Sequence, residues 1–589
     1  MKNKMRKTTQ YLMPFQKNGE AKDRYRIYPS FKLEDGEICT GIKSLANRIC
    51  DEKIICIDGY IGVYFELFRK SLNNALLEIG CTANWVDVSK AMLSEEQVEN
   101  LVEPFMGKPD SIFGTRATIG LADFFDVCKL AELKAKHGDN LTIYYGCGAS
   151  LIKNEGILLY IDLPKNELQF RVRAESVRNL GTTKVSDMKT TYKRYYFIDW
   201  VVLNKHKKEI LKDIDIILDG QREDVYPWME GDAFRKGLKQ MGQSPFRARP
   251  WFEPGIWGGA WIKDKIDGLN KEVKNYAWSF ELITPENGIV FQSSKNLLEV
   301  SFDFIMYAEG ESVMGALDYS KFGDEFPIRF DFLDTFDGGN LSVQCHPRPE
   351  YCKEHFGETI TQEETYYILD RKNDATVYLG FREDIEPKRF EKTLWNSFNS
   401  NTPIDITEFV QTHPAKKHDL FLIPPGTIHA SGIDNLVLEI STTPYIFTFK
   451  MYDWVRPDLD GNPRPLNIEH GMKNLYFDRK GEKVKKEFIS QPVELNKGED
   501  WVRYELPTHE KHSYRVNRYH FNSEIAIETE GKCHVLSLVE GTSIKIESEN
   551  GMCETFQYAE SFVVPASAKS YTITNISDNE AMLIVAFMK

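Results

Sequence analysis

The hydrophobic pattern of the chain changes near residue 245, and this change constrains the fold more than any other feature. Before it, short apolar runs such as IICIDGY (54–60) alternate with helical patterns such as YFELFRKSLNNALLEIG (64–80). Strands separated by helices predict a parallel sheet with helices on both faces. After it, short strand-like runs separated by turns follow one another, which is typical of a β-sandwich or barrel. The sequence therefore predicts a multidomain protein, with an α/β part followed by all-β parts.

Three domains are expected from this pattern and from the length of 589 residues, at roughly 100–200 residues per domain. The α/β domain is placed at 1–245. An all-β domain follows at 246–480, with a small helical insert at about 381–414. A polar connector near 477–501 leads into a second β-domain at 481–589.

Charge and composition exclude several classes of function. The chain has 74 Lys and Arg against 88 Asp and Glu, a net charge of −14, which argues against general binding to nucleic acid or to an anionic membrane. It contains no apolar run of about 18 residues that could span a bilayer, and its N-terminus lacks the apolar core of a signal peptide. The ten cysteines are scattered without a CxxC pair, as expected for reduced thiols in a cytoplasmic protein. The sequence carries no signal for an oligomeric state.

Four side chains in the second part form a candidate metal site. Gln344 and His346 lie two apart in LSVQCHP, so they face the same side of a strand. Glu364 follows 18 positions after His346, and His429 follows 65 positions after Glu364. One amide, two imidazoles and one carboxylate suit zinc, or less selectively manganese, iron or cobalt. Either histidine alone could be an ordinary core or surface residue, but the joint pattern favours a catalytic metal.

The same segments resemble the cupin superfamily and, within it, the type I mannose-6-phosphate isomerases. Asp419, Pro424, Gly426 and His429 match the cupin motif D-x4-P-x-G-x2-H. The segments IWGGAWIKDKI, LSVQCHP, EETYYILD, IPPGTIHASG and FKMYDWVRPDLDGNPRPLNIEH resemble isomerase blocks and occur in family order between about 250 and 589. The resemblance implies cupin jelly-roll domains, a zinc ion or another divalent metal, and conversion of mannose 6-phosphate to fructose 6-phosphate. The implied partner is a small sugar or sugar phosphate, with no nucleic acid and no membrane.

The resemblance also assigns roles to individual residues. It makes Gln344, His346, Glu364 and His429 the metal ligands. Glu439 falls on an active-site glutamate, and Lys450 replaces an arginine, so both are expected to be catalytic. The substrate-binding residues implied are Ser342, Lys450 and Arg456.

Two departures from the family pattern bear on the substrate. Family lysines are replaced by Asp331 and Gln362, in a pocket that must hold a phosphate dianion. Arg329 or Arg348 could compensate for the lost cations. We therefore expect weak isomerisation of mannose 6-phosphate. The alternatives are a metal cupin acting on another, unphosphorylated sugar and a non-catalytic sugar-sensing protein.

The N-terminal part resembles a uridine-kinase-like P-loop domain that has lost its chemistry. The outline strand–Gly turn–helix is present, but the working form G-x-x-x-x-G-K-[ST] falls on Tyr64, Phe65 and Glu66. No lysine or hydroxyl remains for nucleotide phosphates and Mg²⁺. A run of arginines follows where such kinases carry lid residues, at Arg171, Arg173 and Arg178, although a solvated helix face would look the same. We expect an inactive kinase-like domain that does not hydrolyse ATP.

Overall fold

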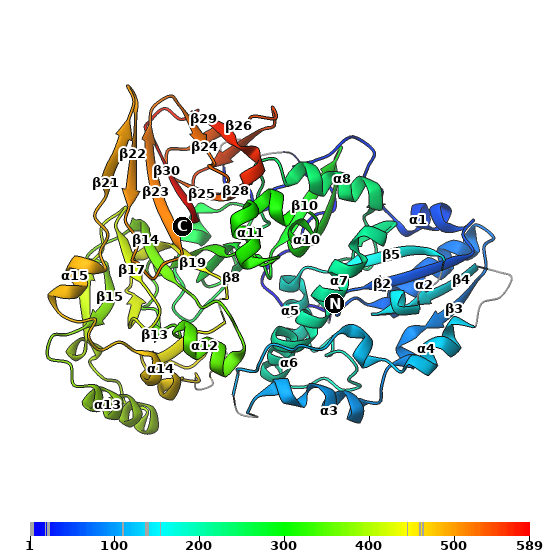
Figure 1. Cartoon of the computed structure of the whole chain (residues 1–589), viewed down its shortest axis with the longest axis horizontal. Coiled ribbons are helices and arrows are strands. Elements are labelled where there is room, and N and C mark those ends of the chain that lie inside the picture. The colour runs from blue at the N-terminus through cyan, green and yellow to red at the C-terminus, as the bar shows by residue number, and fades with distance from the viewer. Residues whose placement is uncertain are drawn as a thin grey trace.

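Three parts follow one another along the chain in the computed structural model, which describes residues 5–17, 19, 24–108, 111–135, 141–152, 155–444, 446–458, 461 and 464–589. An α/β part, blue to cyan in Figure 1, lies on one side of the molecule. The green and yellow middle part and the orange and red C-terminal part lie on the other side. The structure has multiple parts and many β-sheets, as expected. The middle part is not all-β, because helices such as α10 (Asp303–Met314) and α12 (Pro349–Phe356) lie between its strands.

The N-terminal part is a six-stranded sheet with the order β3-β4-β2-β5-β6-β7. The first five strands in this order are parallel and β7 is antiparallel. The strands are β2 (Ile54–Gly59), β3 (Ala83–Asp87), β4 (Leu141–Tyr145), β5 (Ile157–Asp162), β6 (Ile216–Asp219) and β7 (Trp228–Glu230). The helices are α1 (Ile42–Ile49), α2 (Phe65–Glu78), α3 (Glu95–Met106), α4 (Val127–Lys134), α5 (Lys165–Arg173), α6 (Met188–Arg194), α7 (Trp200–Ile210) and α8 (Gly231–Met241).

Both faces of this sheet are buried, as its continuous apolar strands predict. Ile55 and Ile57 of β2 pack in one core cluster with Leu72 of α2. Cys56, between them, packs in the other cluster with Leu203 of α7. Alternate residues of one strand therefore face apolar cores on opposite sides of the sheet.

The middle part contains two larger antiparallel sheets, with the orders β17-β14-β19-β12-β9-β8 and β16-β15-β18-β13-β20. The first consists of β8 (Trp251–Glu253), β9 (Trp278–Leu282), β12 (Ile328–Asp334), β14 (Glu364–Arg371), β17 (Leu420–Ile423) and β19 (Asn435–Thr442). The second consists of β13 (Val343–Cys345), β15 (Thr376–Phe381), β16 (Val410–Pro414), β18 (His429–Ser431) and β20 (Phe449–Tyr452). The helices are α9 (Trp261–Lys265), α10 (Asp303–Met314), α11 (Ala316–Phe322), α12 (Pro349–Phe356), α13 (Pro387–Ser400), α14 (Ile468–Asn474) and α15 (Glu482–Glu487).

Two features of the middle part differ from the sequence-based expectation. Only the first half of the helical insert expected at 381–414 is helical, as α13, because Val410–Pro414 pairs with β15 as an edge strand. A small third sheet joins β1 (Phe31–Lys32) in parallel to β10 (Gly288–Ser293), which pairs in turn with β11 (Asn296–Ser301). The first residues of the chain thus cross from the α/β part into the middle part.

The C-terminal part packs two antiparallel sheets, with the orders β21-β22-β23-β30-β25-β28 and β24-β29-β26-β27, around an apolar core of its own. Its strands are β21 (Val493–Lys497), β22 (Trp501–Leu506), β23 (Tyr514–Phe521), β24 (Glu524–Glu528), β25 (His534–Glu540), β26 (Ser543–Ser548), β27 (Cys553–Gln557), β28 (Ser561–Val564), β29 (Ser570–Asn575) and β30 (Ala581–Met588). The hydroxyl of Tyr514 donates to the carbonyl of Ile440 at 2.8 Å. Ser513 holds the Glu363 carboxylate, with its hydroxyl at 2.9 Å. The C-terminal part therefore supports strands β14 and β19 of the middle part.

Candidate metal centre and its cavity

His346, Glu364 and His429 meet between the two sheets of the middle part. Glu364 begins β14 of one sheet, while His429 begins β18 and His346 directly follows β13 of the other. The Nε2 atoms of both histidines lie 2.9 Å from the same Glu364 oxygen. All three side chains are buried, and their potential ligand atoms lie within 4.8 Å of one another. The structure therefore brings three of the four predicted ligands together as one cluster.

The surroundings of this cluster fit a divalent metal. The Nδ1 atom of His346 faces the Phe447 carbonyl at 3.3 Å, and that of His429 faces the Thr427 carbonyl at 3.0 Å. A proton held on each Nδ1 leaves the Nε2 lone pairs directed at the centre, the arrangement of metal-binding imidazoles. The second oxygen of Glu364 is buried and has no hydrogen-bond partner among the residues described. These donors suit zinc.

The pKa shifts of Glu364 and His346 favour the forms that bind a metal. Burial alone would raise the pKa of Glu364, but the two imidazoles together outweigh it and hold that pKa well below its usual range. Burial lowers the pKa of His346, so its ring is neutral. A carboxylate and neutral imidazoles are the forms that bind a metal.

Gln344, the fourth predicted ligand, lies beside the cluster. In the sheet, its backbone lies opposite His429 of β18 on one side and opposite Lys450 of β20 on the other. Its amide nitrogen lies 3.4 Å from Nε2 of His429, and a half-turn of the amide would bring the oxygen to that position. The four predicted residues thus share one location, and their role as ligands stays a prediction.

A cavity of about 800 Å³ opens beside Gln344. It falls within the size range of metabolite pockets. The predicted site residues Ser342, Glu439 and Lys450 line it together with an aromatic wall. That wall contains Trp257, Trp278 and Phe280.

Glu439 belongs to a buried charge network that includes both substituted family positions. Arg329 donates from Nε to Asp331 at 3.0 Å and from Nη2 to Glu439. Gln362 donates its amide to the same Glu439 oxygen at 3.1 Å. Burial raises the pKa of Asp331 to about 6 and that of Glu439 well above its usual range. Arg329 therefore neutralises Asp331, and is itself held by two carboxyl groups.

The remaining predicted substrate residues cluster at Asp453. Ser342 donates its hydroxyl to Asp453 at 2.8 Å, and Arg456 contacts it at 2.6 Å. Arg456 also donates to the carbonyl of Asn340, and it is Arg464, another partner of Asp453, that lines the cavity. Arg464 was not selected from the sequence, although it lies in the same isomerase-like block.

Lys450 is half-buried and lines the cavity. Burial lowers its pKa to about 8, with smaller effects from neighbouring arginines. A lysine with a pKa of about 8 can exchange a proton near neutral pH.

Sequence comparison with known proteins agrees with this geometry. YvyI of Bacillus subtilis (strain 168), named as a candidate mannose-6-phosphate isomerase, is 24% identical over 342 residues, which cover 56% of this chain and 96% of YvyI. Mannose-6-phosphate isomerase ManA of the same organism is 25% identical over 40% of this chain and 68% of its own length. This chain is similar in sequence to mannose-6-phosphate isomerases over about half its length.

Structure comparison finds the same group of proteins. The crystal structure of mannose 6-phosphate isomerase from Bacillus subtilis has a TM-score of 0.47 and 22% identity, and covers 58% of this chain and 99% of its own. Phosphomannose isomerase from Salmonella typhimurium, in a mutant form, has a TM-score of 0.45 and 13% identity, and covers 59% of this chain.

Residues 41–243 match a family model described as a domain of unknown function, DUF8485. No helix of the described part of the chain is long and apolar enough to cross a membrane. The kinase-like interpretation of the N-terminal part stays a prediction.

The loop after β2 packs against α5. Arg171 is buried and donates to the carbonyls of Gly62 at 2.8 Å and Gly220 at 2.9 Å. A side chain at Gly62 would collide with Leu168 of α5. Arg171 thus stabilises the loop and is not part of a solvated helix face.

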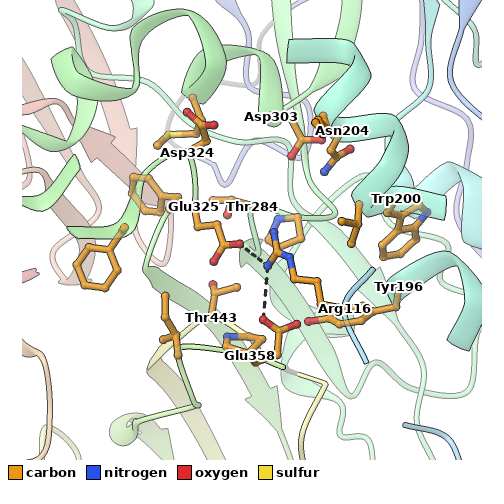
Figure 2. A pocket seen from close by; sticks show the side chains of 18 of the residues that line it. Arg116, Tyr196, Trp200, Asn204, Thr284, Asp303, Asp324, Glu325, Glu358 and Thr443 are labelled. Carbon is orange, nitrogen blue, oxygen red and sulfur yellow. Dashed lines mark hydrogen bonds and ion pairs between the residues drawn. The ribbon is translucent and has the colours of Figure 1, made fainter. Parts of the chain in front are cut away.

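A second cavity of about 640 Å³ lies between the α/β part and the middle part (Figure 2). Arg116 of the α/β part contacts Glu325 at 2.5 Å and Glu358 at 3.5 Å. Trp200 and Asn204 lie across the cavity from these two carboxylates (Figure 2). Ion pairs across this cavity therefore attach the α/β part to the middle part.

Proposed function

We propose that the protein is a metal-dependent aldose–ketose isomerase of the mannose-6-phosphate isomerase type, with cupin folds in its middle and C-terminal parts. The observation that supports it best is the His346–Glu364–His429 cluster beside a cavity lined by Glu439 and Lys450. The proposed reaction converts mannose 6-phosphate to fructose 6-phosphate.

The metal would be held by Gln344, His346, Glu364 and His429, with zinc as the expected ion. When bound, a divalent metal would act as a Lewis acid toward the oxygens of the sugar. The Ser513–Glu363 hydrogen bonds brace the strand next to Glu364, and so help to fix one ligand.

Two cavity residues can move the proton that the reaction transfers between neighbouring carbons. Lys450, with its pKa lowered to about 8 by burial, can accept or return a proton. Glu439, whose pKa is raised by burial and by the nearby Asp331 and Glu364 carboxyls despite Arg329, can donate one to a sugar oxygen. We assign both as catalytic residues.

The phosphate would be bound at the end of the cavity near Ser342. Ser342 is oriented by Asp453, which also holds Arg456 and Arg464. Hydroxyl and cationic groups arranged together are suited to a phosphate group.

The competing proposal is a metal cupin for an unphosphorylated sugar, or a sugar-sensing protein without catalysis. One observation favours it: Asp331 and Gln362 stand where the family has lysines, so neither position carries a cation. Against it, Arg329 offsets the negative charge of Asp331, so a phosphate would meet less repulsion than the sequence suggested.

We further propose that the N-terminal part is a degenerate kinase-like domain that transfers no phosphoryl group. The parallel sheet with its first strand at the centre supports the comparison. The loop contact with Arg171 and the absence of the motif lysine and hydroxyl oppose nucleotide binding.

A substrate panel tests the proposal. Zinc-loaded protein should isomerise mannose 6-phosphate and leave free mannose unchanged. His429→Ala should lose both zinc and activity, whereas the exposed control His355→Ala should keep both. Turnover confined to an unphosphorylated sugar would favour the competing enzyme, and binding without turnover would favour the sensor.

A further inference from the structure

One wall of the metal-site cavity is built by the α/β part. Lys7, Arg173 and Tyr192 of this part line the same cavity as Gln344 and Lys450 of the middle part. A ligand in this cavity would therefore lie between two domains.

The α/β wall is attached to the middle part beside the cavity. The hydroxyl of Tyr192 donates to the Glu286 carboxyl at 3.1 Å. The backbone N–H of Asn166 donates to the backbone carbonyl of Glu286 at 3.3 Å. Arg173 donates to Glu253 at 2.9 Å. Together with the Arg116 ion pairs at the second cavity (Figure 2), these contacts attach the wall to the middle part.

The segment that carries Lys7 is fixed to the same wall. The Lys7 amide donates to the Phe170 carbonyl at 2.9 Å. The preceding Arg6 pairs with Glu167 of α5 at 2.8 Å. The backbone of Lys7 is thus anchored, while the residue lines the cavity and is exposed to solvent.

The cations lining the cavity differ in their availability to a ligand. Three of them are already paired with carboxylates, namely Arg173 with Glu253, Arg329 with Asp331 and Glu439, and Arg464 with Asp453. For Lys7 and Lys450, the described residues provide no ion-pair partner. These two ammonium groups are therefore free to bind an anion.

We propose that the α/β part forms half of the substrate site and that Lys7 binds the phosphate of a phosphosugar. This proposal rests on the proposed isomerase function. Lys7 supplies from another domain a cation that positions 331 and 362 do not supply. On this proposal, neither the α/β part nor the middle part alone contains the complete substrate site.

Kinetics of Lys7 variants test the proposal in the full-length, zinc-loaded protein. Lys7→Ala should raise KM for mannose 6-phosphate about tenfold, because a charge-assisted hydrogen bond to phosphate is lost. The kcat should change by less than about twofold, since the contact is the same in substrate and transition state. Lys7→Arg should restore most of the affinity. Lys17→Ala removes a lysine of the same segment that does not line the cavity, and should behave like the unmodified protein.

A binding assay separates this proposal from the proposed function. Calorimetry should show that Lys7→Ala weakens binding of fructose 6-phosphate about tenfold, without changing zinc content or melting temperature. If fructose 6-phosphate binds in a Lys7-dependent way but is not turned over, the two-domain site stands and the isomerase proposal fails. If the enzyme is active and Lys7→Ala matches Lys17→Ala, the two-domain site is wrong and the isomerase stands. If the sugar phosphate is neither bound nor turned over, both proposals fail.

Discussion

Replacing Arg329 by Met should destabilise the middle part, and more at high pH than at low pH. Arg329 is buried and contacts two buried carboxyl groups, Asp331 at 3.0 Å and Glu439. Without the guanidinium, any charge left on these carboxyls is buried and uncompensated. Removing one partner of a buried ion pair typically costs about 3–5 kcal/mol, which is the loss in unfolding free energy expected at pH 8.

The pH dependence follows from the direction of the carboxyl pKa shifts. Burial already raises the pKa of Asp331 to about 6 and that of Glu439 well above its usual range, and loss of Arg329 would raise both further. A carboxyl whose folded-state pKa is raised gives stability at low pH that is lost as the pH rises through that pKa. Lowering the pH from 8 to 5.5 allows the carboxyls to bind protons, at about 1.4 kcal/mol per pH unit for each group. The deficit should therefore shrink to about 1–2 kcal/mol at pH 5.5.

Urea unfolding at pH 8 and pH 5.5, followed by tryptophan fluorescence, measures both deficits. Arg382→Met is the matched control, because Arg382 is an exposed arginine of the same part and should cost under about 0.5 kcal/mol at either pH. Adding Asp331→Asn to Arg329→Met should recover about half of the loss at pH 8. Equal deficits at the two pH values, or a loss no larger than that of Arg382→Met, would refute this account of the network.

Further predictions concern the metal, the domain junction and the N-terminal loop. Glu364→Gln should lower zinc affinity at least about tenfold, measured by competition with a chelator; unchanged affinity would remove Glu364 from the ligand set. Burial raises the pKa of Glu286 to about 7, so the folded protein loses stability as the pH rises through that value and the buried carboxyl ionises. Glu286→Gln stays neutral and should therefore raise the free energy of unfolding by about 2 kcal/mol at pH 8 and by less at pH 5, measured by thermal unfolding. Arg171→Met should lower the unfolding free energy of the α/β part by about 2–4 kcal/mol, because buried carbonyls lose their donor. Calorimetry should show no ATP binding by either the unmodified protein or this variant. Measurable ATP hydrolysis by the unmodified protein would contradict the degenerate-loop interpretation.

The sequence predicted which residues come together at the candidate metal site better than it predicted their surroundings. Strand alternation places Gln344 and His346 on one face, a local property that two-residue spacing determines. Glu364 joins them because the sheet that contains β14 packs against the sheet that contains β13, a long-range contact that only the resemblance to a known family could indicate. Two-residue spacing also places Arg329 and Asp331 on one face of β12. Whether the guanidinium contacts Asp331, Glu439 or a ligand depends on the packing around it, which the sequence does not indicate.

The contribution of the first residues of the chain could not be predicted at all. Lys7 lies in a short polar segment without periodicity, and its position depends on how two domains dock. The same limit applies to Arg171, because a basic residue in a lid-like segment looks alike whether it is solvated or donates to buried carbonyls. The strand Val410–Pro414 was expected to be helical because it follows a strong helix signal, and its pairing with β15 decided otherwise.

Proton exchange during turnover tests the central claim most directly. Zinc-loaded protein is incubated with mannose 6-phosphate in D₂O and followed by NMR, beside zinc-free protein and His429→Ala. The account predicts that fructose 6-phosphate forms and that solvent deuterium enters carbon-bound positions of the sugar only with the zinc-loaded, unmodified protein. Isomerisation at the same rate after zinc removal, or no isomerisation by protein that holds stoichiometric zinc, would contradict it.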